Sequence, residues 1–167
     1  MFYRGCALGA VYNKNELVSQ VNFWRKQGKM IVFTNGCFDI IHRGHIEYLK
    51  MAKAYGDVLI LGLNSDRSVR ALKGENRPYN NEDDRAFILS QLVSVDAVCI
   101  FDEDTPRKLL EDIKPDILVK GGDYTVEEVV GRDIVERYGG KVMTVPLIKG
   151  QSTTSLIYKI SETEPKT

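Results

Sequence analysis

The two histidines of the chain, His42 and His45, stand three residues apart in the segment His42-Arg43-Gly44-His45. This segment follows a short apolar run, residues 30–34, that predicts a strand, and it opens a stretch with helical spacing of apolar residues, 45–55. Residues three apart on a helix share a face, so the two imidazoles can both contact the same anion. A helix N-terminus adds free N–H groups and a partial positive charge. The spacing therefore indicates a phosphate site rather than two unrelated surface or core histidines.

A zinc site is the sharper alternative for this pair, but the sequence offers no third ligand at a fixed spacing from it. The three cysteines, Cys6, Cys37 and Cys99, are far apart and form no CxxC pair, which favours reduced thiols in a cytoplasmic protein. The phosphate loops GxxxxGK[ST] and GxGxxG are absent from the sequence, which argues against kinase-like and dinucleotide-binding proteins. We expect a phosphate site without a metal held by the protein.

The elements that position this segment alternate along the chain. Apolar runs without polar alternation are typical of strands that are covered on both faces. Such runs predict five strands, over residues 30–34, 58–64, 97–101, 117–120 and 142–145. Helices are expected over 14–27, 45–55, 83–92, from Thr105-Pro106 to near Pro115, over 126–138, and from the QSTTS segment to about residue 160, with a short helix after residue 64. The alternation predicts an α/β fold: a Rossmann-like, doubly wound, parallel five-stranded sheet in a single domain.

Within this fold, residues 1–29 are expected to form an N-terminal helical extension, residues 30–160 the α/β domain, and residues 161–167 a flexible polar tail. The stripe of Leu17, Val21 and Trp24 is interpreted as helix packing, with a dimer contact as the alternative.

Composition sets the broad class. The chain has 167 residues with 23 basic and 23 acidic side chains, so its formal net charge is zero. A general nucleic-acid or membrane-surface binder would carry a basic excess, and no apolar run approaches the roughly 20 residues of a membrane span. We therefore expect no nucleic-acid and no membrane partner, and we place the protein in the cytoplasm. A small anionic ligand stays compatible with this balance, since a pocket needs only a few local cations.

Four segments together resemble a known family. FTNGCFDIIHRGHIEYL, LNSDRSVRALKGENRPY, ILVKGGDY and GQSTTSLI are similar to the heptose 1-phosphate adenylyltransferases, within the cytidylyltransferase-like nucleotidyltransferase superfamily. The HxGH quartet alone specifies only the superfamily, whereas the combination is much more specific. The likeness runs from about Asn15 to Ile160, so residues 30–160 would be the nucleotidyltransferase domain.

The resemblance implies a reaction of ATP with D-glycero-D-manno-heptose 1-phosphate that yields ADP-heptose and pyrophosphate, with Mg²⁺, for lipopolysaccharide core precursor synthesis. A sugar phosphate oxygen would attack the α-phosphorus in line, without a covalent enzyme intermediate. It also implies a homodimer or a higher homo-oligomer. Two alternatives stay open: a cytidylyltransferase acting on glycerol 3-phosphate or a similar phosphorylated alcohol, and a nucleotide-binding protein without turnover.

The resemblance assigns roles to the residues near the carboxyl ends of the strands, where such folds bind ligands. His42 and His45 would stabilise charge on the α-phosphate, and Lys73 is a further catalytic candidate. Asp39, Arg77 and Arg85 are substrate-binding candidates. Asp39 could instead cap its loop or hold Mg²⁺ through water, and Arg85 could instead form an ion pair. Nucleotide-binding candidates are Thr34, Asn35, Gly36, Cys37, Phe38, Gly44, Lys120, Gly121, Asp123, Ser152, Thr153 and Thr154.

One position departs from the superfamily pattern. The second phosphate motif, ISSTxxR, ends in Arg, and Ile157 stands at that place in this chain. Neutralisation of the phosphates must then depend on other cations, for which Lys73 and Arg77 are candidates. Cys37 lies near the expected nucleotide, but no feature of the sequence indicates a lowered thiol pKa, so a packing role is expected.

Overall fold

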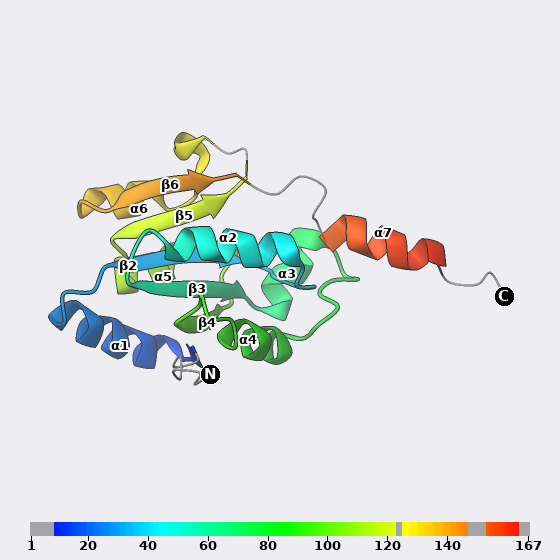
Figure 1. Ribbon diagram of the computed structural model, residues 1–167, viewed down its shortest axis with the longest axis horizontal. Helices are drawn as coiled ribbons and strands as arrows, with labels where there is room; N and C mark the ends of the chain where they lie inside the picture. The colour runs from blue at the N-terminus through cyan, green and yellow to red at the C-terminus, as the bar shows by residue number, and fades with distance from the viewer. Residues whose placement is uncertain (1–8, 123–124, 147–152, 164–167) are drawn as a thin grey trace, which may run out of the picture.

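The computed structural model describes residues 9–122, 125–146 and 153–163, and a parallel sheet forms its centre (Figure 1). The strands are β1 (Ala10–Val11), β2 (Ile31–Gly36), β3 (Val58–Asn64), β4 (Ala97–Phe101), β5 (Ile117–Gly121) and β6 (Lys141–Val145). Their order across the sheet is β1-β4-β3-β2-β5-β6, and every neighbouring pair is parallel. The predicted α/β class with a parallel sheet is confirmed.

The expected number of strands is wrong by one. The described residues form a six-stranded sheet, and the additional strand, β1, pairs with β4 through Ala10 opposite Ala97 and Val11 opposite Val98. Because β1 has only two residues, its sequence holds no apolar run from which a strand could be predicted.

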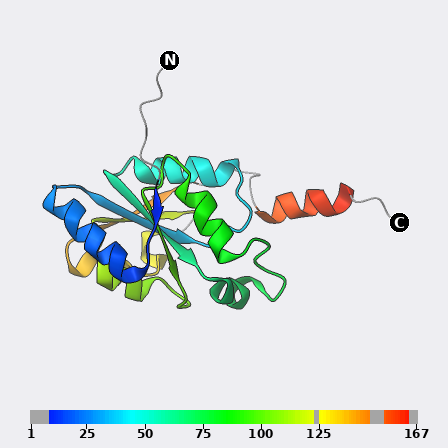
Figure 2. The ribbon, with the colours of Figure 1, turned by 90° about the horizontal axis from the view of Figure 1, so that it is seen from below.

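Helices cover both faces of the sheet, as a doubly wound fold requires (Figure 2). One apolar core lies between the sheet and α1 (Lys14–Lys26), α5 (Arg107–Ile113) and α6 (Arg132–Arg137). The other lies between the sheet and α2 (Arg43–Lys53) and α4 (Glu82–Ser90). All seven residues of β3 are buried, which explains why this strand reads as a continuous apolar run. The remaining helices are α3 (Asp66–Lys73), the short 3₁₀ helix η1 (Val126–Glu128) and α7 (Thr153–Thr163), which projects from the body of the protein in both views.

The first helix packs as expected. Asn13 caps α1 by accepting a hydrogen bond from the backbone N–H of Glu16, whose side chain accepts one from the N–H of Asn13 in return. Leu17 and Val21 are 0% and 1% exposed in the core, with Trp24 packed against it. The interpretation of this stripe as helix packing is therefore confirmed, and the dimer contact is not needed to explain it.

The single helix expected over residues 126–138 is wrong. The structure has η1, an extended residue at Val129, and then α6 beginning after Gly131. Gly131 has φ +92°, a left-handed conformation that interrupts a right-handed helix and that glycine adopts without strain. The apolar spacing of the segment continues across this break, so the periodicity concealed it. The expected start of α5 also shifts by one residue, because Pro106 rather than Thr105 occupies the cap position.

The order of the strands creates one point where ligands bind in such folds. β2 and β5 are neighbours in the sheet. The chain continues from β2 to β3 toward one edge of the sheet, and from β5 to β6 toward the opposite edge. Connections that diverge in this way leave a crevice above the carboxyl ends of the two strands. In the described part of the chain, no helix is both long and apolar enough to cross a membrane.

Candidate functional site

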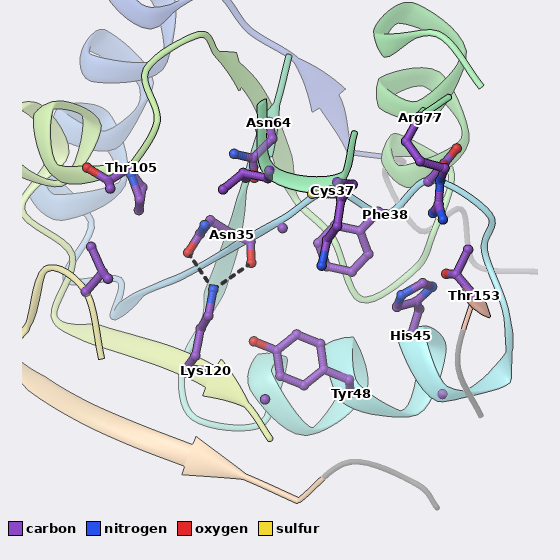
Figure 3. A pocket seen from close by; sticks show the side chains of 18 of the residues that line it. Asn35, Cys37, Phe38, His45, Tyr48, Asn64, Arg77, Thr105, Lys120 and Thr153 are labelled. Atoms are coloured by element: carbon purple, nitrogen blue, oxygen red, sulfur yellow. Dashed lines mark hydrogen bonds and ion pairs between the residues drawn. The ribbon is translucent and has the colours of Figure 1, made fainter. Parts of the chain in front are cut away.

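A pocket of about 690 Å³ opens above the carboxyl ends of β2 and β5 (Figure 3). Its walls come from the loop that joins β2 to α2, the end of β3, the end of α3 and its following loop, the loop after β4, the end of β5, the region around η1 and the start of α7. Segments far apart in the sequence therefore converge on the crevice that the strand order creates.

The paired imidazoles line this pocket at the start of α2. His42 is the N-cap residue of α2, in an extended conformation with φ −141° and ψ 170°, and His45 lies in the first turn. Their ring centroids are 3.8 Å apart and the ring planes differ by 21°, so the rings are stacked. Phe38 packs against the other side of His45, with a centroid distance of 5.0 Å. The predicted convergence of two imidazoles on one helix start is present in the structure.

Both imidazoles are biased toward the neutral form. Burial lowers the pKa of His42, and burial together with the neighbouring His42 lowers the pKa of His45 to about 4. The Nδ1 atoms of both rings are buried without a hydrogen-bond partner in the described part of the chain. Near neutral pH the pair can therefore act as uncharged hydrogen-bond donors through Nε2, provided that the proton resides there.

The N-terminus of α2 suits an anion. The first helical hydrogen bond at this end is donated by the N–H of His45 to the carbonyl of His42, at 3.0 Å, so the N–H groups of Arg43 and Gly44 precede it. In this described helix, the N-cap makes no side-chain cap bond and the first turn carries no acidic residue. The partial positive charge of the helix end is therefore available to a ligand in the pocket, beside the two imidazoles.

Asp39 fixes the loop that covers this side of the pocket. Its carboxylate is 1% exposed and accepts hydrogen bonds from Arg77 Nε at 2.5 Å, from the N–H of Tyr79 at 2.8 Å and from the N–H of Asn80 at 3.0 Å. The loop-capping alternative therefore describes Asp39 best, and its expected role as a substrate ligand is not supported by this geometry. Arg77 lines the pocket with its guanidinium paired to Asp39 and 5.1 Å from the ring of Tyr79.

Arg85 lies inside the protein rather than in the pocket. Its guanidinium donates to the carbonyl oxygens of Cys37, Asn64 and Asn80 at 2.6, 3.0 and 3.0 Å, and to Asp66 Oδ1 at 2.7 Å. With its side chain 0% exposed, it has no surface to offer a substrate. This placement corrects the expectation that Arg85 binds substrate: it holds the loop after β2, the end of β3 and the start of α4 together from behind.

Two lysines from different elements line the pocket. Lys73 stands at the end of α3 and Lys120 near the end of β5. The Nζ atom of Lys120 lies 3.2 Å from Asn35 Oδ1 and 3.5 Å from Asn35 O. Cys37 also lines the pocket, and burial raises its thiol pKa against the opposing effect of Lys73, Arg85, Lys120 and Arg77. A thiol with a raised pKa is a poor nucleophile, which agrees with the expected packing role.

The structure brings most of the other predicted residues into the pocket. Thr34 is an exception: it is 0% exposed and its hydroxyl lies 2.5 Å from that of Tyr48, so its expected contact with a nucleotide is wrong in this structure. Asp123 and Ser152 lie outside the described residues. The predicted residues that line the pocket are Asn35, Gly36, Cys37, Phe38, Asp39, His42, Gly44, His45, Lys73, Arg77, Lys120, Gly121, Thr153 and Thr154.

Several residues that line the pocket were not predicted from the sequence. Asn64 ends the buried strand β3, and Asp104 and Thr105 follow β4, so their position after parallel strands was the signal that could have found them. The segment Glu128–Val130 was hidden by the wrong prediction of a continuous helix. The full set of lining residues that were not predicted is Tyr48, Asn64, Leu72, Asp104, Thr105, Pro106, Glu128, Val129 and Val130.

No group of three or more His, Cys, Asp or Glu side chains that could hold a metal ion is found in the described part of the chain. The acidic residues that line the pocket are Asp39, Asp104 and Glu128. Of these, Asp39 is fully engaged by its loop, and Glu128 Oε2 accepts hydrogen bonds from the N–H and hydroxyl of Thr125.

Comparison with known proteins agrees with this geometry. A sequence profile described as cytidylyltransferase-like matches residues 33–164, which is well over half of the chain and includes both histidines. The chain belongs to the cytidylyltransferase-like family. This assignment confirms the superfamily resemblance drawn from the HxGH segment, and the observed fold agrees with it.

Curated relatives of this cytidylyltransferase-like chain are similar over nearly its whole length. The bifunctional protein HldE of Geobacter metallireducens is 57% identical over 150 residues, which cover 90% of this chain and 31% of the relative. HldE of Aliarcobacter butzleri is 58% identical over 137 residues, which cover 82% of this chain and 28% of the relative. The chain thus spans about a third of the length of these relatives.

Two solved structures share the fold. A lipopolysaccharide core biosynthesis protein from Thermoplasma volcanium superposes with a TM-score of 0.61 at 31% identity, covering 74% of this chain and all of the other. A pantoate–β-alanine ligase from Francisella tularensis superposes with a TM-score of 0.55 at 18% identity, covering 92% of this chain and 79% of the other. The second likeness concerns the fold alone.

Proposed function

We propose that this cytidylyltransferase-like chain is an adenylyltransferase that converts ATP and D-glycero-D-manno-heptose 1-phosphate into ADP-D-glycero-D-manno-heptose and pyrophosphate. The observation that carries the proposal is the stacked pair of His42 and His45 at the start of α2, inside a pocket at the switch point of the sheet. The similarity to HldE proteins and to a lipopolysaccharide core biosynthesis protein supports the sugar substrate and a role in lipopolysaccharide core precursor synthesis.

The proposed reaction is one in-line displacement. An oxygen of the sugar 1-phosphate forms a bond to the α-phosphorus of ATP, while the bond from that phosphorus to the bridging oxygen breaks and its electron pair leaves with pyrophosphate. Such a step needs positioning and donors aimed at the phosphoryl oxygens more than it needs a covalent nucleophile. His42, His45 and the first N–H groups of α2 supply donors of this kind on one side of the pocket.

Other groups would hold the remainder of the triphosphate. Thr153 and Thr154 lie at the start of α7 and line the same pocket, as Figure 3 shows for Thr153. The hydroxyl of Thr153 donates to the carbonyl of Ile40 at 3.4 Å and keeps its lone pairs as acceptors. Arg77 adds a fixed guanidinium on this side, since Asp39 holds it in place. These contacts would offset the absence of an arginine at the position of Ile157. Gly121, at the end of β5, lines the pocket where the backbone could contact the base or the ribose.

The carboxylates that line the pocket indicate which side chain would coordinate Mg²⁺. Mg²⁺ in nucleotide sites is held by phosphate oxygens with one or two carboxylates and water. Both carboxylate oxygens of Asp39 are engaged in hydrogen bonds, whereas Asp104 lines the pocket and is exposed. Among the described residues, Asp104 is therefore the best candidate to complete the coordination of a metal brought in by ATP. When bound, Mg²⁺ would neutralise charge on the triphosphate and polarise its phosphoryl oxygens.

The test is a substrate panel scored by pyrophosphate release. The protein, with Mg²⁺, is mixed with each of four nucleoside triphosphates and with heptose 1-phosphate, glycerol 3-phosphate, ethanolamine phosphate and unphosphorylated heptose. We expect release with ATP and heptose 1-phosphate above every other pair. Faster release with CTP and glycerol 3-phosphate would replace this proposal by the cytidylyltransferase alternative. ATP binding without release from any pair would favour a protein without turnover.

We extend the proposal to the setting of the enzyme. We place it in the cytoplasm, where ATP is supplied, and we expect a homodimer or a higher homo-oligomer that binds ATP and a sugar 1-phosphate and neither nucleic acid nor membrane. Light scattering on the eluting protein during size-exclusion chromatography measures the oligomeric state, and a monomeric mass at micromolar concentration would contradict it.

A further inference from the structure

The backbone of Phe38, in the loop between β2 and α2, has a conformation that bulky residues rarely adopt. Its φ of +43° lies in the left-handed region, where a Cβ atom crowds the following carbonyl oxygen. Lys114, the other non-glycine residue with a positive φ in the described part of the chain, ends α5, and this conformation is common at the end of a helix. Phe38 follows a strand instead. Strain at such a position persists only where the surrounding structure imposes it.

The residues on both sides of Phe38 impose this conformation. The carbonyl of Cys37 accepts a hydrogen bond of 2.6 Å from the buried guanidinium of Arg85. The carboxylate of Asp39 is 1% exposed and accepts hydrogen bonds from Arg77 and from two backbone N–H groups of the loop after α3. Both neighbours are thus anchored to distant segments of the chain, and these bonds offset the strain at Phe38.

The ring of Phe38 contacts the end of β2 and the imidazole of His45. A Cβ atom at Gly36 would lie 2.8 Å from Cε2 of the ring, so the ring occupies space that is open only because residue 36 is a glycine. The ring centroid is 5.0 Å from that of His45, and the ring planes differ by 58° (Figure 3). Phe38 is 6% exposed and belongs to the core between the sheet, α2 and α4, so the packing against the sheet sets the position of its ring.

The imidazole of His45 lacks the polar contact that usually orients a catalytic histidine. Such a histidine is normally held by a hydrogen bond to its second ring nitrogen. The Nδ1 atom of His45 is buried and has no hydrogen-bond partner in the part of the chain that the structure describes, and the same holds for Nδ1 of His42. Ring contacts are therefore left to orient the stacked pair. Among those of the described residues, the contact with Phe38 joins the pair to the sheet.

We propose that Phe38 is the positioning residue of the histidine pair: its ring holds the imidazole of His45, and through it that of His42, in the orientation that donates to the α-phosphate. This inference rests on the proposed adenylyl transfer and names what orients its donors. The role is distinct from the nucleotide contact that the resemblance implies for Phe38. A carboxylate partner would favour the charged imidazolium, whereas an aromatic ring excludes water and leaves the imidazole neutral.

The first test separates turnover from binding. Phe38→Leu removes the ring and keeps a branched apolar side chain. Phe101→Leu is the matched control, because Phe101 is 5% exposed, belongs to the core on the other face of the sheet and lies outside the pocket lining. Each change is made in the wild type and in His45→Asn, and kcat and KM for pyrophosphate release are measured with ATP, Mg²⁺ and heptose 1-phosphate. Phe38→Met, which is closer to phenylalanine in volume, takes the place of Phe38→Leu if the leucine variant does not fold.

We expect Phe38→Leu to lower kcat about 10- to 100-fold, since a displacement of about 1 Å in a catalytic group has an effect of this size. KM for both substrates should stay within about threefold of the wild type, and Phe101→Leu should leave kcat within the same limit. In the His45→Asn background, Phe38→Leu should lower kcat by less than about threefold, because a residue that acts through His45 has no imidazole left to orient.

The second test needs no turnover. The chain has two histidines, so the ring proton signal of His45 in a nuclear magnetic resonance spectrum is identified by its loss in His45→Asn. Burial and the charge of His42 lower the pKa of His45 to about 4, so in the wild type this signal should barely shift between about pH 8 and pH 4.5. In Phe38→Leu, water reaches the imidazole, its pKa rises toward about 6.5, and the signal should titrate within this range. The charged side chains that line the pocket stay the same in both proteins: Asp39, Lys73, Arg77, Asp104, Lys120 and Glu128.

Three kinetic results would overturn the inference: an unchanged kcat in Phe38→Leu, a rise of KM in place of the fall of kcat, or an equal loss in the His45→Asn background. A titration of His45 that is the same in Phe38→Leu and Phe101→Leu would overturn it as well. Failure of the proposed function is a different outcome. In that case the wild type releases no pyrophosphate, while the titration of His45 still shows whether the ring of Phe38 holds the imidazole.

Discussion

Replacing Arg85 by Ala should lower the free energy of unfolding far more than it lowers the free energy of ATP binding. The side chain is 0% exposed, and its guanidinium donates to Cys37 O at 2.6 Å, Asn64 O at 3.0 Å, Asn80 O at 3.0 Å and Asp66 Oδ1 at 2.7 Å. Removal of one partner from a buried ion pair costs about 3–5 kcal/mol. The three carbonyls that lose a charged donor and the space left by the side chain place the expected loss near the upper end of that range.

The assay is urea unfolding followed by circular dichroism, with the free energy of unfolding extrapolated to water. Arg85→Lys keeps the charge but reaches fewer of the acceptors, so it should lose about half as much as the Ala variant. Arg70→Ala removes an exposed arginine of α3 and should change the free energy of unfolding by less than about 0.5 kcal/mol. Below its unfolding transition, Arg85→Lys should bind ATP within about threefold of the wild type.

The reasoning fails if Arg85→Ala loses less than about 1 kcal/mol of unfolding free energy. It also fails if Arg85→Lys retains its stability but loses ATP or acceptor affinity. Either result would return Arg85 to the substrate-binding role that the sequence suggested.

Three further changes test other parts of the structure. The free energy of unfolding should fall by about 1–2 kcal/mol as the pH is lowered from 7.5 to 4.5, because His45 is protonated below about pH 6.5 in the unfolded chain but only near pH 4 in the folded chain. Thermal melts of wild type and His45→Asn over this pH range measure the change. Equal slopes of melting temperature against pH in the two proteins would contradict it. Tyr48→Phe removes a hydroxyl that bonds Thr34 and should cost about 1–2 kcal/mol in urea unfolding, so an unchanged midpoint would argue against that bond. Gly131→Ala should lower the free energy of unfolding by about 1–3 kcal/mol more than Gly139→Ala. Both glycines have a positive φ, +92° and +87°, but only a Cβ at position 131 would clash with the core side chain of Leu110. Equal losses in the two variants would mean that backbone conformation alone decides.

The sequence predicted the parts of the fold that rest on local pattern. The ranges expected for β3 and β4, residues 58–64 and 97–101, agree with the structure, because both strands are buried apolar runs bounded by polar residues. The histidine pair was found for a similar reason: its residue types, its spacing and its position after the first long strand are all local properties.

What the sequence could not supply depends on contacts between distant segments. Arg85 is an exposed-looking residue in a polar helix start, and only the packing of α4 against the loop after β2 and the end of β3 buries it. Thr105 enters the pocket because β4 lies two strands away from β2 in the same parallel sheet. The break at Gly131 depends on one positive φ that apolar spacing does not encode.

Some expectations stay predictions. Asp123 and Ser152 fall outside the described residues, so their nucleotide contacts rest on the resemblance alone. Thr153 and Thr154 line the pocket, but their hydroxyls acquire a role in phosphate binding only through the proposed function. Alanine variants of these two threonines are matched in size and position, and they separate the two hydroxyls in the substrate panel.

Single-turnover pyrophosphate release by His42→Asn and His45→Asn, with ATP, Mg²⁺ and heptose 1-phosphate, tests the central claim most directly. Each substitution removes one imidazole of the stacked pair at the start of α2 and leaves the rest of the pocket lining in place. We predict that each variant keeps the wild-type circular dichroism spectrum and releases pyrophosphate at least about 100-fold more slowly, the loss typical of a donor aimed at developing charge. A near-normal rate in either variant would contradict the account.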